Sequence, residues 1–125
     1  MKIIVLKFGG TSVGSIKRIK EVAKIIKSYS KKYHVIVLSS AMSGTTNKLI
    51  SMSREISEYF PDHEYDTLVS AGEQISCSLL AGQLLVSGIK SRSWMAWQIP
   101  ILTEGKHKNS RIKYINKSKV LKFLK

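Results

Sequence analysis

Residues 7–15 read Lys7-Phe8-Gly9-Gly10-Thr11-Ser12-Val13-Gly14-Ser15. An apolar run at residues 3–6 precedes them and a stretch with helical spacing follows, which predicts a turn between a strand and a helix. Two adjacent glycines let the backbone approach a polyanion, exposed amides can donate to it, and Lys7 adds positive charge. The pattern therefore favours phosphate binding. A glycine turn with Ser15 as the helix N-cap is the structural alternative.

This glycine loop does not follow the Walker design of nucleotide-binding loops. The Walker pattern G-x-x-x-x-G-K-[ST] places its lysine after the glycines, whereas Lys7 precedes Gly9 and Gly10. Any nucleotide site in this chain must therefore have a different design.

A second loop rich in small side chains follows another apolar run, at residues 33–38. It reads Ser39-Ser40-Ala41-Met42-Ser43-Gly44-Thr45-Thr46-Asn47. Two buried strands with a helix between them predict a parallel β-α-β unit, so both loops should lie at the carboxyl edge of the sheet, where α/β proteins bind ligands. The alternative is a pair of capped helices, with Thr46 and Asn47 as caps.

The third candidate is Ser70-Ala71-Gly72-Glu73, which opens a predicted helix at residues 70–86. A serine followed three residues later by glutamate is typical of a capping box, in which Glu73 accepts from the Ser70 amide. The functional alternative places Glu73 at the mouth of the cleft, where it would receive the ammonium group of an amino-acid substrate.

The remaining pattern predicts an α/β fold with a largely parallel sheet, because segments with strand and helix character alternate. Pro61 should stop the helix at residues 47–60 and begin an acidic turn. The predicted strands are 2–7 and 33–38, with one or two short strands within 89–102. The predicted helices are 16–26, 47–60, 70–86 and 116–125, and residues 103–110 are expected to form a polar loop.

The length and charge of the chain limit the classes of function that it could have. The chain has 125 residues, which suits one domain or a piece of one, and its formal net charge is +13. Such charge raises nucleic acid as a partner. However, only 4 of its 21 basic residues are arginine, the side chain preferred for phosphate and base recognition, and the lysines are dispersed. The sequence therefore disfavours nucleic-acid binding.

Several other classes are disfavoured by what the sequence contains. No segment approaches the roughly 20 apolar residues that a membrane span needs. The single Cys77 lies among apolar residues, which predicts a core cysteine in a reducing cytoplasm. His34, His63 and His107 lack partners at metal-ligand spacing, and the acidic residues show no Mg²⁺ site. Trp94 and Trp97 are interpreted as packing residues.

Four segments together resemble the N-terminal part of aspartate kinases, in the amino-acid-kinase family. The order and spacing of the segments match as well, and the likeness extends across nearly the whole chain. The segments are residues 7–14, 40–49 and 70–76, and then Trp97-Gln98 with Ile101-Leu102-Thr103 and His107-Lys108-Asn109-Ser110-Arg111-Ile112.

The resemblance implies a three-layer αβα sandwich that uses ATP to phosphorylate the side-chain carboxylate of L-aspartate. This reaction is the first step towards lysine and diaminopimelate, threonine and methionine. Carried over by motif, the ATP phosphate would be held by Lys7, which is also the implied catalytic residue, together with Phe8, Gly9, Gly10 and Ser40. Thr46 and Glu73 would hold aspartate. The family also implies Mg²⁺, for which this chain shows no ligand.

The chain departs from the family in two ways. Glu104, Lys106 and Ser110 differ mildly from the residues usual at those places. More seriously, family members continue beyond the equivalent of Lys125, into a GRGGSD-like segment, the adenine-binding half and regulatory ACT domains. Residues 1–125 are therefore expected to be the N-terminal part of an amino-acid-kinase domain, without the nucleotide-binding half and the ACT domains.

Two hypotheses follow from this partial match. The first is a truncated or split aspartate kinase that is weak or inactive alone. The second is a catalytically dead binding module that associates with a complementary kinase chain through its unfinished sheet edge, or with further copies of itself.

Overall fold

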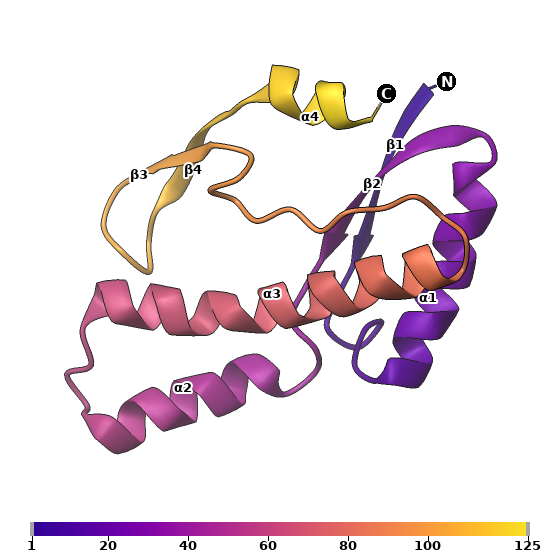
Figure 1. Ribbon diagram of the computed structural model, residues 1–125. Coiled ribbons are helices and arrows are strands. Elements are labelled where there is room, and N and C mark those ends of the chain that lie inside the picture. Colours follow the sequence, from indigo (N-terminus) through magenta and orange to yellow (C-terminus); the bar gives the residue numbers. More distant parts are fainter. Residues whose placement is uncertain (1, 125) are drawn as a thin grey trace.

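The computed structural model describes residues 2–124. Strands and helices alternate in the first part of the chain, and a hairpin and a short helix follow (Figure 1). The elements are β1 Lys2–Phe8, α1 Ile16–Ser30, β2 Tyr33–Ser39, α2 Thr45–Ile56, α3 Asp62–Val86, β3 Ile101–Glu104, β4 Arg111–Ile115 and α4 Lys117–Phe123. The predicted α/β class is confirmed, as a partial α/β sandwich with a small parallel sheet.

The predicted β-α-β unit is present. Strands β1 and β2 pair in parallel over their full length, from Lys2 opposite Tyr33 to Phe8 opposite Ser39. Between them, α1 turns its apolar stripe inward, with the side chains of Ile19, Val22, Ala23 and Ile26 buried. Ser15 is the N-cap of α1, and its hydroxyl accepts from the Arg18 amide at 3.2 Å.

Helix α3 completes the core on the same face of the parallel pair. Figure 1 shows α1 beside the C-terminal half of α3 and α2 beside its N-terminal half. Val13 from the first loop and Leu80 and Leu84 from α3 join the buried stripe of α1. The two strands, α1 and α3 therefore hold the first loop in a fixed place.

Helix α3 begins earlier than the sequence predicted. It starts at Asp62 rather than Ser70, because Pro61 occupies the N-cap position, where its missing amide costs nothing, and its carbonyl accepts from the Tyr65 amide. Asp62 and Glu64 in the first turn suit the positive helix end. Ser70 is therefore inside the helix and donates to the Thr67 carbonyl at 2.8 Å, so the predicted capping box is wrong.

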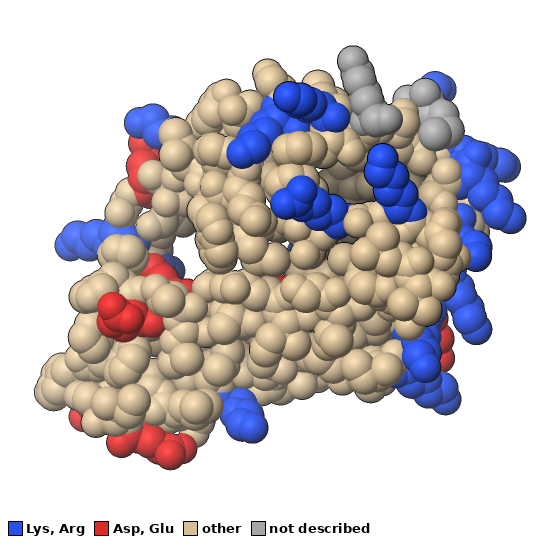
Figure 2. Space-filling view, viewed as in Figure 1, with Lys and Arg blue, Asp and Glu red and all other residues tan. Residues whose placement is uncertain are grey.

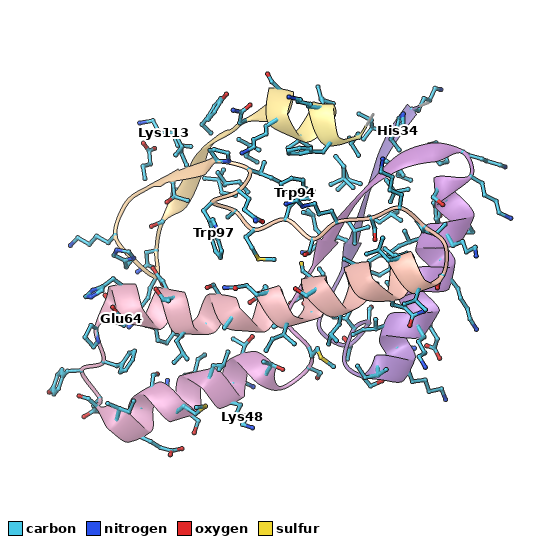
Figure 3. The ribbon with its side chains drawn as sticks, viewed as in Figure 1. His34, Lys48, Glu64, Trp94, Trp97 and Lys113 are labelled. Carbon is cyan, nitrogen blue, oxygen red and sulfur yellow. The ribbon has the colours of Figure 1, made fainter. Side chains whose placement is uncertain are left out.

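The C-terminal third differs from the predicted pattern. Residues 89–100 contain no strand, and β3 and β4 form an antiparallel hairpin, so the expected polar loop at residues 103–110 is shorter. Trp94 packs as predicted, stacked on Phe123 of α4 with ring centroids 3.9 Å apart. Trp97 is 64% exposed, so its predicted packing role is wrong. Figure 3 shows Trp94 between α4 and α3, and Trp97 between the hairpin and α3.

The second face of the parallel pair is open, although both strands were predicted to be buried. Alternate residues of β1 face away from the core, and Ile3 and Val5 are 46% and 56% exposed. Leu38, opposite Lys7 in the register, is 54% exposed on the same face. Within residues 2–124, no helix has both the length and the apolar character needed to cross a lipid bilayer.

The tip of the hairpin is attached to the start of α3 through Asp66. Its carboxylate lies 2.6 Å from His107 Nδ1 and accepts from the Lys108 amide at 3.2 Å. The Lys108 ammonium pairs with Asp62 at 2.6 Å, and the Lys108 backbone has a φ of 64°. The hydrogen bond from His107 is the main cause that holds the pKa of Asp66 below its usual value of 3.8.

We predict that acid releases this tip from α3. A carboxyl whose pKa is lowered by folding stabilises the fold above its unfolded pKa, and the contribution is lost as pH falls through the folded value. The Lys108 amide, followed by NMR, should therefore lose its hydrogen bond below pH 3.8 before the β1–β2 amides do. Asp66→Asn should loosen the tip at neutral pH already, whereas Glu21→Gln on α1 should not. A tip that stays attached in Asp66→Asn would contradict this account.

Candidate functional site

The loops that follow β1 and β2 touch at the carboxyl edge of the parallel pair. The Ser40 amide donates to the Phe8 carbonyl at 3.1 Å, which continues the strand pairing into the second loop. A Cβ atom added to Gly10 would lie 2.9 Å from the Ala41 carbonyl oxygen, closer than real Cβ atoms come. The predicted convergence of the two loops therefore depends on the absence of a side chain at Gly10.

The first loop is closed by its own backbone. The Gly9 carbonyl accepts from the amides of Ser12 and Val13 at 3.0 and 3.3 Å. Val13 is fully buried and anchors the loop in the core, while Phe8 is packed against that core. Lys7 is exposed and has Leu38 opposite it in the register. The Lys7 side chain therefore lies on the exposed face of the β1–β2 pair, and the Gly9 backbone is accessible.

Helix α3 holds the second loop from the other side. Glu73 Oε1 accepts from the Ala41 amide at 3.3 Å. One turn further along, the Ser76 hydroxyl donates to the Ser40 carbonyl at 2.6 Å. The predicted site residue Glu73 therefore binds the same peptide group as Ser76, the one that joins Ser40, also predicted, to Ala41. Ser76 was not predicted as a site residue from the sequence. The feature that could have indicated it is a serine within the apolar stripe of a helix.

Helix α2 begins at the same place. Its N-cap is Gly44, with a φ of 80°, and no side chain caps it, so the alternative in which Thr46 and Asn47 are the caps is wrong. Thr46 lies in the first turn, partly buried. A Cβ atom added to Gly72 would lie 3.0 Å from the Ala41 Cβ and 3.3 Å from the Thr45 Cγ2, so α3 also packs closely on this turn.

A small cavity of about 170 Å³ lies next to Glu73. Its walls are mostly apolar and are formed by α3 and the irregular segment before β3. The lining residues are Ser70, Glu73, Gln74, Cys77, Trp94, Met95, Ala96 and Trp97. Burial, and secondly the charge of Glu73, raises the pKa of the Cys77 thiol, which fits its predicted packing role rather than a reactive one.

Charge is unevenly distributed around this site. Five of the eight acidic residues lie between residues 55 and 66, where α2 ends and α3 begins. Figure 2 shows this acidic group at one end of the molecule and Lys and Arg over much of the rest. Among residues 2–124, no three His, Cys, Asp or Glu side chains come together to hold a metal ion. The site offers amides, hydroxyls, Lys7 and one carboxylate, Glu73.

Comparison with known proteins shows the family to which the chain belongs. The chain matches the family described as "Amino acid kinase family" over residues 2–125. The chain belongs to the amino acid kinase family.

Aspartokinases are among the relatives of this amino acid kinase chain. It is 43% identical to the aspartokinase of Rickettsia felis and 45% identical to that of Geobacillus stearothermophilus, in each case over 99% of its length. It spans 32% and 31% of those two proteins, about a third of their length. The resemblance to the N-terminal part of aspartate kinases is therefore confirmed.

Solved structures agree with the fold. The crystal structure of aspartate kinase from Synechocystis matches 70% of this chain, with a TM-score of 0.66 and 40% identity, and the match covers 15% of that chain. E. coli aspartokinase III, solved with aspartate and ADP, matches 90% of this chain with a TM-score of 0.77, and 35% of that chain is covered. At 19% identity, this second match supports the fold.

Neighbouring glycines in the first loop should respond differently to substitution. Gly10→Ala should lower the free energy of unfolding by about 1–3 kcal/mol, because the new methyl group forces the Ala41 carbonyl away. Gly9 has nothing within 4 Å of an added Cβ, so Gly9→Ala should change stability by less than about 0.5 kcal/mol. Urea unfolding of both variants measures the difference. Equal losses would show that the two loops do not depend on this contact.

Proposed function

We propose that this chain is part of an aspartate kinase, a phosphotransferase that uses ATP to phosphorylate the side-chain carboxylate of L-aspartate. The observation that carries the proposal is the junction at Ser40 and Ala41. Its peptides contact the glycine loop through Phe8 and the carboxylate of Glu73 within two consecutive residues. The proposed phosphate grip and the proposed ammonium acceptor therefore both contact one short loop.

This arrangement suits transfer to a carboxylate. Such a nucleophile is already ionised near neutral pH, so the reaction needs no general base. Catalysis then depends on bringing two anions together and neutralising the charge that develops on the transferring phosphoryl group. Lys7 and the amides of the glycine loop would supply that positive field without reorganising.

The roles divide between the two sides of the loop junction. Lys7, with the backbone of Phe8, Gly9 and Gly10, would hold the phosphate, as the resemblance of residues 7–14 to aspartate kinases implies. Ser40 would contact the same phosphate from the second loop. The aspartate ammonium would bind Glu73, and Thr46, in the first turn of α2, would contact the same substrate from the positive end of that helix.

The residues of this chain do not fit a complete Mg²⁺ site. A hard cation requires several oxygen ligands, and Glu73 is a single acidic side chain at the loop junction. We therefore assign no step to a metal ion held by these residues. Residues 1–125 span about a third of the aspartokinases they match, so we expect these residues alone to form a weak enzyme.

Removal of Lys7 tests the proposed phosphate grip. Lys7→Ala should reduce aspartyl phosphate formation by about two orders of magnitude, and it should weaken ATP binding, because the positive charge beside the phosphate is lost. Lys24→Ala, on the exposed side of α1, should change neither. Hydroxylamine trapping of the product and calorimetric titration with ATP give the two readouts. An unchanged ATP affinity would remove Lys7 from the site, and turnover near that of a complete enzyme would overturn the expected weakness.

A second candidate function is supported by the open sheet face. Ile3, Val5 and Leu38 expose apolar surface in an otherwise basic molecule, and both strands of the pair are edge strands. The chain would then act as a binding module for a complementary kinase chain. Its strong positive charge opposes association with further copies of itself, which makes the complementary chain the preferred partner.

Two exposed apolar residues provide a matched test of this binding role. Val5→Asp should abolish complex formation with a separately produced polypeptide that carries the rest of an aspartate kinase domain, because it buries an unpaired charge. Ile56→Asp, on α2 and 75% exposed, should leave the complex intact. Light scattering after gel filtration measures both. A wild-type chain that stays monomeric in the mixture would refute the binding-module function.

A further inference from the structure

We infer that Ser76 is a positioning residue, which holds the Ser40 peptide at the place where the phosphate grip and Glu73 meet. The inference rests on the proposed function, because it concerns how two groups of that site are kept together. Ser76 is in the middle of α3 and would not touch either substrate itself.

The burial and the bonding of Ser76 are unusual for a serine in a helix. Serine is unfavourable in helix interiors, and its hydroxyl commonly bonds back to its own helix. Ser76 is 0% exposed, and its hydroxyl lies 2.6 Å from the Ser40 carbonyl but 3.1 Å from the carbonyl of Glu73, one turn back. A hydroxyl has a single proton, so the shorter bond, to Ser40, takes it.

The Ser40 peptide is thereby held from two sides. Its amide donates to Phe8 at the end of β1, and its carbonyl accepts from Ser76. The next amide, that of Ala41, donates to Glu73. Two side chains one turn apart on α3 therefore bind the two ends of one peptide group, and the end of β1 holds the same loop from the opposite side.

Loss of the Ser76 hydroxyl should loosen both halves of the proposed site. The Ser40 carbonyl would remain in a partly buried place without its donor, which favours movement of the loop towards water. Movement of Ser40 shifts the Ala41 amide away from Glu73, because the Ser40 carbonyl and the Ala41 amide belong to one peptide group. One substitution remote from the ligands should thus weaken the phosphate contact of Ser40 and change the place of Glu73.

Ser53 provides a matched control within the same chain. Among residues 2–124, it and Ser76 are the two buried polar side chains, at 2% and 0% exposure. The Ser53 hydroxyl donates to the Ile50 carbonyl at 2.8 Å, inside its own helix α2. Ser53→Ala therefore removes a buried helical hydroxyl without touching the second loop.

The experiment compares Ser76→Ala, Ser76→Cys and Ser53→Ala with the wild-type chain. Hydrogen exchange of the Ser40 and Ala41 amides is measured by NMR, global stability by urea unfolding, and ligand affinity by titration with ATP and with L-aspartate. Both Ser76 variants should speed exchange of the two amides by about tenfold beyond the change in global stability, and weaken ligand binding by a similar factor. Ser53→Ala should lower stability at most, and leave local exchange and affinity unchanged.

Several results would overturn the inference. Unchanged local exchange in the Ser76 variants would do so, as would equal effects in Ser53→Ala. Ser76→Cys fills the site with a somewhat larger side chain that is only a weak donor, so it decides the question if the cavity left by Ser76→Ala prevents folding. If the wild-type chain binds neither ATP nor aspartate, the proposed function fails, but the exchange comparison still decides whether Ser76 holds the loop.

Discussion

The close approach of two backbone loops is the constraint on which the rest of this site depends. Strands β1 and β2 end level with each other, at Phe8 and Ser39, so their loops leave the sheet side by side. Only a glycine at position 10 lets the first loop reach the Ala41 carbonyl. With that contact in place, the second loop is near enough to α3 to bond with it, and the elements that would bind phosphate and substrate become one unit.

The core that supports this unit lies on one side of the sheet. Helices α1 and α3 bury their apolar stripes against Leu6, Phe8, Val35 and Val37 of the two strands, and the opposite face has no comparable cover. The apolar residues that stabilise the fold and those that remain exposed therefore lie on different faces of the same strands. A charge of +13 works against compaction, so the one-sided core must also oppose self-repulsion within the chain.

The first part of the fold could be predicted from sequence, because its periodicities are unambiguous. The strands, α1 and its Ser15 cap follow from short apolar runs and helical spacing. The start of α3 could not be predicted as easily, since Pro61 is compatible with both a helix stop and a helix start, and Asp62 and Glu64 support the second. The hairpin depends on tertiary contacts, above all those of Asp66, which composition does not reveal.

For the candidate site too, sequence motifs predicted some features, and others became clear only from the packing of the helices and loops. The sequence motifs predicted Lys7, Ser40 and Glu73 as site residues. They left two interpretations of Glu73, as a helix cap or as a substrate contact. The structure removes the first, because Ser70 is inside α3. One oxygen of the Glu73 carboxylate accepts from the Ala41 amide, and the second oxygen has lone pairs of its own. In the proposed role, the bond to the loop would therefore leave Glu73 an oxygen for an ammonium group.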